Sequence, residues 1–198
     1  MKKFALALAP VIALLATAPA ALAEKIPLNA ISNYLNGLTT MQSEFTQINP
    51  DGTISAGTVY IQRPNRVRFE YKNSRQLVLA SGGQVAVFDA KSNQGPQIYP
   101  LSETPLSIIL APNVNLGRQG MVTGHTEVNN STIVTAQDPA NPQYGNIQMV
   151  FTQPTELRQW IVTDDTGKKT TVILGEGRKG VSFRPSTFVI QNEIDRRR

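Results

Sequence analysis

The apolar and polar positions of the chain change their period near residue 45, and this change separates a helical start from a long β region. Between Pro27 and Met41 the apolar residues recur every three or four positions, which predicts an amphipathic helix over 27–41. A proline suits the first turn of such a helix. The opposite side is rich in asparagine and serine, so the helix should lie on another layer of structure rather than inside it.

From Phe45 onward the period is two, which is typical of β-strands. The clearest example places Val67, Phe69 and Tyr71 in alternation with charged residues. Turn sequences, among them Pro50-Asp51-Gly52 and Gly82-Gly83, separate the runs. The strands expected from this pattern cover 45–48, 53–62, 66–71, 77–80, 85–88, 122–128, 132–136, 147–152, 157–163 and 170–174, with short additional pieces at 181–183 and 188–190. The pattern predicts one large antiparallel sheet of about ten to eleven strands.

A second, short helix is predicted over 106–110. Thr104 is its expected N-cap and Pro105 its expected first residue, because threonine and proline favour these two positions. The body of the helix is apolar nearly all round, and Pro112 ends it. A helix of this kind must be enclosed or must cover an apolar opening.

The interior of the sheet allows two interpretations. Strands 77–80 and 85–88 are apolar on both faces, so each should have a core on one side and a covering element or a cavity on the other. Such a sheet can form a filled sandwich core. It can also remain unclosed around a concave apolar site, the usual form of a pocket for lipids.

The first 23 residues have the pattern of a cleaved secretory signal. Lys2 and Lys3 precede an apolar run that is too short to span a membrane, and Ala21-Leu22-Ala23 forms a signal peptidase site. The remaining residues, 24–198, are expected to form a single domain. Position 24 is a glutamate rather than the cysteine that would carry a lipid anchor, so we expect a released protein.

Composition and motifs argue against several classes of function. Without the signal, 17 basic residues face 14 acidic ones, and this net charge of +3 is scattered along the chain, whereas a nucleic-acid-binding protein would show a denser basic stripe. The chain has no cysteine and one histidine, His125, which we expect to be exposed on a strand and which argues against a zinc site. Asp164-Asp165 is best explained as part of a turn, and 175–180 lacks the ending of a phosphate-binding loop. We therefore expect neither an enzyme nor a cofactor.

Several segments resemble the outer-membrane lipoprotein carrier family, LolA. The similarity is strongest over roughly residues 40–110, and the remainder agrees in length and strand pattern only. The matching segments are Phe45-Thr46-Gln47, the run from Gly57 to Tyr71 that contains Arg63-Pro64-Asn65, the hairpin from Ser81 to Asp89, and Thr104-Pro105-Leu106. The resemblance implies an unclosed antiparallel half-barrel, mainly β, whose helices form a lid over a hydrophobic cavity.

The resemblance also implies functional residues. Arg63 matches the gating arginine of the family, whose planar guanidinium can bind several lid carbonyls at once. If Arg63 points inward, strand alternation sends Val59 and Ile61 the same way. Arg66 and Arg68 should face outward. The expected lining of the cavity is Val59, Ile61, Val67, Phe69, Leu77, Leu79, Val85, Val87, Ile108, Ile109 and Leu110.

The expected function is that of a monomeric periplasmic carrier. The resemblance implies that it receives acylated lipoproteins from an inner-membrane ABC transporter and delivers them to an outer-membrane acceptor. Two alternatives remain, namely a carrier for another amphiphile, such as a phospholipid or a hydrophobic metabolite, and a regulatory module that senses lipoproteins. A lipid-tethered acceptor with a similar half-barrel is disfavoured by Glu24.

Overall fold

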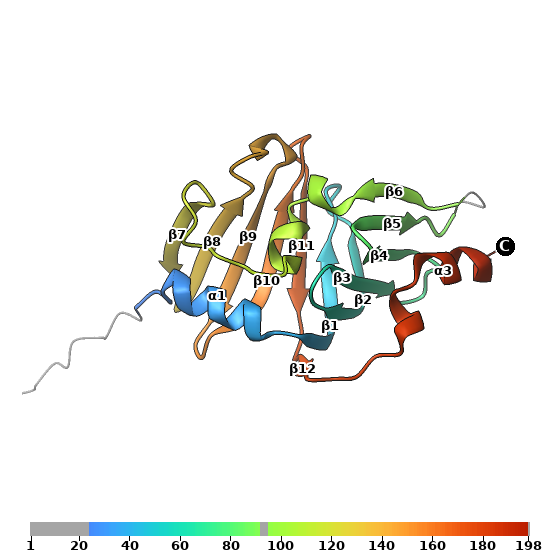
Figure 1. Ribbon diagram of the computed structural model, residues 1–198, viewed down its shortest axis with the longest axis horizontal. Helices are drawn as coiled ribbons and strands as arrows, with labels where there is room; N and C mark the ends of the chain where they lie inside the picture. The colour runs from blue at the N-terminus through green and yellow to red at the C-terminus, as the bar shows by residue number, and fades with distance from the viewer. Residues whose placement is uncertain (1–23, 92–94, 198) are drawn as a thin grey trace, which may run out of the picture.

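The computed structural model describes residues 24–91 and 95–197, so the expected signal peptide lies outside the described residues. Within these ranges the chain folds into a curved, unclosed antiparallel sheet of twelve strands, with helices against both of its faces (Figure 1). The predicted fold class, mainly β with an unclosed antiparallel sheet, is confirmed. None of the described helices is long and apolar enough to cross a membrane.

The bounds of the elements are as follows. The strands are β1 (Thr40–Ile48), β2 (Ile54–Gln62), β3 (Arg66–Tyr71), β4 (Leu77–Ser81), β5 (Gln84–Phe88), β6 (Gln97–Pro100), β7 (Val122–Val128), β8 (Ser131–Gln137), β9 (Asn146–Thr152), β10 (Glu156–Thr163), β11 (Lys169–Leu174) and β12 (Arg178–Lys179). The α-helices are α1 (Leu28–Gly37), α2 (Leu106–Leu110) and α3 (Ile190–Arg197). Short 3₁₀-helices are η1 (Leu101–Glu103), η2 (Pro142–Tyr144) and η3 (Pro185–Phe188).

Strand β1 joins the two halves of the sheet. The order is β6-β5-β4-β3-β2-β1-β11-β10-β9-β8-β7, and β12 adds a short pairing to the start of β1. Each half is a meander in which strands that follow one another in sequence are neighbours, an arrangement that short turns produce readily. Strands β6 and β7 are the two free edges, which is why the sheet does not close into a barrel.

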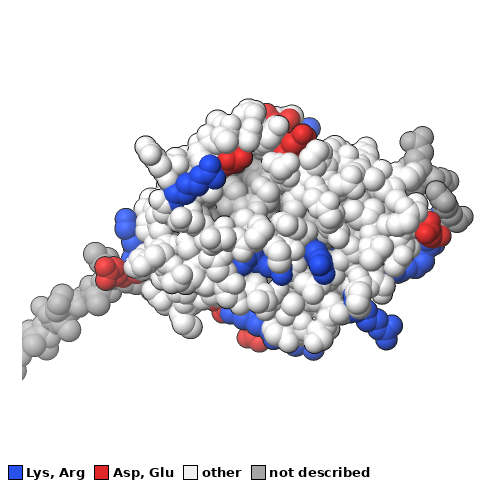
Figure 2. Space-filling model, in the orientation of Figure 1, with Lys and Arg blue, Asp and Glu red and all other residues white. Residues whose placement is uncertain are grey.

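Helices α1 and α2 lie across the inner face of the sheet (Figure 1). Their apolar side chains and the inward side chains of the strands form the main core. Ile31 and Leu35 of α1 and Val59 of β2 are 0% exposed. The face that carries the two helices is largely uncharged, and its lysine and arginine side chains are scattered rather than gathered into one stripe (Figure 2).

The outer face of β3, β4 and β5 is covered by the C-terminal segment, η3 and α3 (Figure 1). Phe188 packs there against a second apolar cluster, whose buried members are Leu77, Leu79, Ala86, Phe88 and Phe188 itself. Arg68 also lies under this segment and is 7% exposed. Its guanidinium donates to Glu70 at 2.6 Å and to Glu193 of α3 at 3.1 Å. Arg66 is exposed, as expected, whereas Arg68 faces outward but is buried.

Three local predictions are wrong. The first helix ends at Gly37 rather than Met41, and the chain continues as β1 from Thr40, because glycine and the following β-branched threonines disfavour helix. Thr104 does not cap α2. Its hydroxyl donates to the Leu101 carbonyl at 2.9 Å instead, and Pro105 holds the N-cap position. The segments 181–183 and 188–190 are not strands, since the chain there forms a coil, the end of η3 and the start of α3.

Candidate functional site

A tight turn between β2 and β3 fastens the end of α2 to the sheet. Within this turn Arg63 donates from Nη2 to the Ala111 carbonyl, just after α2, at 2.5 Å. The Asn65 amide donates to the Leu110 carbonyl at 2.9 Å, while the Arg63 amide donates to the Thr39 carbonyl at 2.8 Å and so continues the pairing of β1 with β2. We call these contacts of the 63–65 turn the latch.

The guanidinium of Arg63 is half-buried, and this desolvation lowers its pKa. Arginine nevertheless stays cationic under these conditions, so the bond to the Ala111 carbonyl is a charge-assisted hydrogen bond. Its Nε is buried and donates to no atom of the described residues. An unmet buried donor costs free energy, so the latch is strong at one nitrogen and unsatisfied at another.

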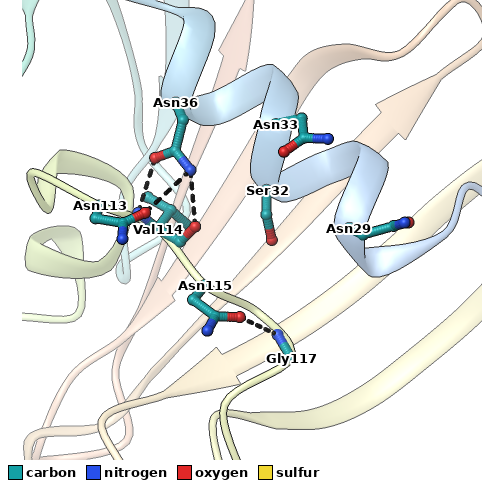
Figure 3. Close-up of a pocket in the computed structure, with 8 residues that line it drawn as sticks. All are labelled: Asn29, Ser32, Asn33, Asn36, Asn113, Val114, Asn115 and Gly117. Carbon is teal, nitrogen blue, oxygen red and sulfur yellow. Dashed lines mark hydrogen bonds between the residues drawn. The ribbon is translucent and has the colours of Figure 1, made fainter.

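Helix α1 is joined to the chain after α2 by side chains one turn apart (Figure 3). The Asn36 amide pairs with both backbone groups of Val114, donating from Nδ2 at 2.9 Å and accepting at Oδ1 at 2.8 Å. The Ser32 hydroxyl accepts from the Leu116 amide at 3.1 Å. Asn36 Oδ1 also lies 3.5 Å from Nη2 of Arg63. We call these contacts the seam, and they make α1 and the segment after α2 one continuous lid.

A polar surface pocket of about 290 Å³ lies along the seam (Figure 3). Its lining is Asn29, Ser32, Asn33, Asn36, Asn113, Val114, Asn115 and Gly117. The pocket is outside the lid and is lined mainly by amides, so it does not have the apolar character expected for a lipid site.

Most of the residues expected to line the cavity are brought together on the inner face. Val59, Ile61, Val67, Phe69, Val85, Ile108, Ile109 and Leu110 belong to the main core, and Val87 is partly buried against it. Leu77 and Leu79 are placed on the opposite face, in the cluster under the C-terminal segment. The register explains this difference, because Phe69 faces Val78 and Val67 faces Ala80 across β3 and β4. The alternate residues of β4 therefore point inward, and the prediction is wrong for these two leucines.

The centre of the inner face is tightly packed among the described residues. Ile61 is 1% exposed and Ile109 is 1% exposed, so no water-sized space adjoins these side chains. The sequence left a filled core and an open concave site as alternatives, and at these central positions the lid packs its own residues against the concave face. At this centre a ligand can contact the strands only if the lid moves away from them.

Aromatic rings form the floor beneath the lid. Phe45 meets Phe69 and Tyr71 edge-to-face, with ring centroids 5.3 Å apart in both pairs, and Phe69 meets Trp160 at 6.2 Å. Gly57 makes this packing possible. A Cβ on Gly57 would lie 1.9 Å from the Glu70 carbonyl oxygen and 2.8 Å from the Phe45 ring. The floor therefore offers a wide apolar surface with polarizable faces.

Two polar side chains interrupt this floor. The Tyr71 hydroxyl donates to Oε1 of Gln47 at 2.8 Å. Burial raises the pKa of Tyr71 to about 12, although the hydrogen bond with Gln47 opposes the rise. The hydroxyl is consequently neutral at physiological pH and remains a donor. Sequence analysis missed both residues, although the inward position of Gln47 follows from the alternation that starts at Phe45.

The single histidine is structural and half-buried rather than exposed. His125 donates from Nε2 to the Ile26 carbonyl at 2.9 Å, while the Ile26 amide donates to the Thr132 hydroxyl at 2.8 Å. Both backbone groups of Ile26 therefore anchor the chain just before α1 to β7 and β8. Asp164 accepts from the Thr166 and Lys168 amides in a turn, as predicted. Nowhere in 24–91 or 95–197 do three metal-binding side chains gather.

Comparison with known proteins gives a consistent result. The family model described as "Outer membrane lipoprotein carrier protein LolA" matches residues 36–191. An outer-membrane lipoprotein carrier protein from Methylococcus capsulatus is 25% identical over 180 residues, which are 84% of this chain and 84% of that protein.

Two solved structures with similar folds are distant in sequence. An uncharacterized conserved protein from Thermus thermophilus is 10% identical, with a TM-score of 0.46 over 81% of this chain and 89% of that chain. A LolA superfamily protein from Nitrosomonas europaea is 10% identical, with a TM-score of 0.40 over 83% of this chain and 98% of that chain.

Proposed function

The chain belongs to the outer membrane lipoprotein carrier protein family, LolA, and we propose that it is a periplasmic carrier that shelters the acyl chains of lipoproteins under its lid. The observation that carries this proposal is the latch. Arg63 ties the end of α2 to the sheet across an inner face made of aromatic and aliphatic side chains. The family model and the relative from Methylococcus capsulatus are both described as carrier proteins.

Opening the latch is the step that admits a ligand. When Arg63 releases the Ala111 carbonyl, α2 can leave the inner face, because the latch is its polar connection to the β2–β3 turn. Acyl chains then replace the lid side chains against the aromatic floor. The apolar area hidden by the lid is thereby covered by ligand rather than by water, which favours exchange over simple opening.

The remaining steps of the route belong to the same proposal. The expected signal peptide, residues 1–23, would export the chain, and Glu24 would leave it untethered. The carrier would act as a monomer, receiving lipoproteins from an inner-membrane ABC transporter and releasing them to an outer-membrane acceptor. The rival cargo is another amphiphile, and mass spectrometry of lipid bound to the purified protein distinguishes the two.

A release assay tests the carrier function. Membrane vesicles that contain the transporter and a lipoprotein are incubated with ATP and the purified protein, and then sedimented. We expect the lipoprotein to leave the pellet in a soluble one-to-one complex with the carrier. Vesicles without ATP are the control. A lipoprotein that stays in the pellet under both conditions would contradict the proposal.

The seam gives a second prediction, for Asn36→Ala. Removing the amide breaks both bonds to Val114, and we expect a loss of about 1 kcal/mol in the free energy of unfolding because the site is exposed to water. The amide of Val114 should exchange with solvent faster, and loading should be faster because the lid is looser. Asn33→Ala is the matched control, since Asn33 lies exposed on the same helix beside the same pocket. Unchanged Val114 exchange would show that the seam does not hold the lid.

A further inference from the structure

Gln47 and Tyr71 form a polar pair within the otherwise apolar floor under the lid. Tyr71 is 8% exposed, and its ring packs edge-to-face against Phe45 of the floor. Gln47 shares the inward side of β1 with Phe45, because the two lie two positions apart on one strand. The pair therefore faces the space that an acyl ligand would occupy after the lid has moved.

The orientation of the Gln47 amide is fixed by a chain of hydrogen bonds that begins at Asn49. Gln47 Nε2 donates to Oδ1 of Asn49 at 2.6 Å. The amide of Asn49 in turn donates to the hydroxyls of Thr53 at 2.9 Å and Ser55 at 3.1 Å. These bonds hold the Gln47 amide in one orientation. The second Nε2 hydrogen and the lone pairs of the Tyr71 hydroxyl oxygen remain to serve a ligand.

The pair lies at the end of the interior where solvent begins to reach the inner face. Along β1 the inward side chains change from buried at Phe45 to half-buried at Gln47. Val172 of β11, which pairs with Gln47, and Trp160 of β10 are still buried, and the same change follows one inward position further along, at Thr170 and Val162. A hydrocarbon tail belongs in the buried part, so the polar end of an acyl group would lie at this rim.

We propose that Gln47 and Tyr71 bind the ester group through which an acyl chain is attached to the lipid anchor of a lipoprotein. An ester carbonyl can accept the free hydrogen of Gln47. Neither side chain is charged, so the pair offers no counter-charge to a free fatty acid and favours a neutral linkage. The inference rests on the proposed function and identifies the part of the cargo that this pair binds.

A pair of matched probes tests this subsite. The first is a synthetic triacylated lipopeptide with two ester-linked palmitoyl chains and one amide-linked chain. The second is the same lipopeptide with ether-linked hexadecyl chains in place of the esters. We expect the wild type to bind the ester probe about 3- to 10-fold more tightly, the range of one net hydrogen bond. Tyr71→Phe and Gln47→Met should lower this ratio toward one, and Tyr71→Phe keeps the ring that the floor needs.

The outcomes separate the two proposals. If the wild type binds neither probe, the carrier proposal fails. If it binds both equally, or if the variants weaken both probes by the same factor, the pair is only a structural link between β1 and β3 and the subsite is refuted. Infrared spectroscopy of an ester probe with a ¹³C-labelled carbonyl gives a second readout on the wild type alone. A carbonyl band that shifts to lower frequency on binding indicates a hydrogen bond, whereas an unshifted band overturns the assignment.

Discussion

Arg63→Leu should accept a lipoprotein almost as well as the wild type and pass it to an acceptor at least tenfold more slowly. The charge-assisted bond between Arg63 and the Ala111 carbonyl is worth about 1.5–3 kcal/mol when the lid closes, and closing is what expels the acyl chains. Leucine cannot form this bond, and its own apolar side chain favours the ligand-filled state. Since about 1.4 kcal/mol is a factor of ten, either effect slows release. The rate of lipoprotein transfer from a preformed complex to outer-membrane vesicles measures this release.

Arg66→Leu is the matched control, because Arg66 is an exposed arginine three residues along the same hairpin. It should load and release normally. Thermal unfolding of both variants should show that Arg63→Leu is less stable than Arg66→Leu by no more than the value of this one bond, so that the sheet still folds and the effect is on the lid. Normal transfer by Arg63→Leu would remove the latch from the mechanism.

The packing of the lid against the floor helps to explain how such a carrier can release its cargo. Three fully buried acyl chains would bind with more than about 30 kcal/mol, whereas non-covalent affinity saturates near roughly −18 to −21 kcal/mol. In the closed structure the lid side chains occupy the floor, among them Leu35 and Ile109. Loading must expose them, at about 1.5–3 kcal/mol for each large apolar side chain left in water. The lid therefore lowers the net affinity to a value from which release is possible.

The sheet could be predicted from sequence because its signals are local. The alternation through Val67, Phe69 and Tyr71 and the turn glycines determine strand after strand. Two strands escaped prediction for physical reasons, since β12 is only two residues long and β6 is an exposed edge strand. Helix α3 was missed because its sequence is strongly polar. The helix is stabilised by its packing against the outer face of the sheet, and local sequence patterns do not reveal such packing.

The candidate site was predictable in part. The resemblance pointed to Arg63, and alternation placed Val59 and Ile61 on the inner face. The face of β4 could not be predicted, because Leu77 and Val78 are equally apolar and only the register with β3 decides between them. The role of Asn36 could not be predicted either. Its role depends on Val114, which is 78 residues away in sequence.

The second large effect is expected from Glu193→Ala on the outer face. Glu193 is 6% exposed and accepts from Arg68 at 3.1 Å and from Arg197 at 3.0 Å. Its loss leaves the buried Arg68 with Glu70 as its remaining carboxylate partner, and breaking a buried ion pair costs about 3–5 kcal/mol. Because Glu70 stays, we expect about 3 kcal/mol, or a fall in melting temperature of roughly 6–12 °C for a domain of this size. Thermal unfolding at pH 7 measures it, with the exposed Glu176→Ala as the control.

The pH dependence identifies the cause of this loss. Burial on its own raises the pKa of Glu193, but hydrogen bonds from Arg197 and Arg68 outweigh it and keep the pKa below its ordinary value of 4.5. A carboxyl whose folded pKa is depressed stabilises the fold above its unfolded pKa, and this contribution disappears as the pH falls through the folded pKa. The stability gap between the wild type and Glu193→Ala should therefore be constant near neutral pH and narrow below about pH 4.5. A gap that persists undiminished at about pH 3 would assign the loss to packing of α3 on β4 rather than to the ion pair.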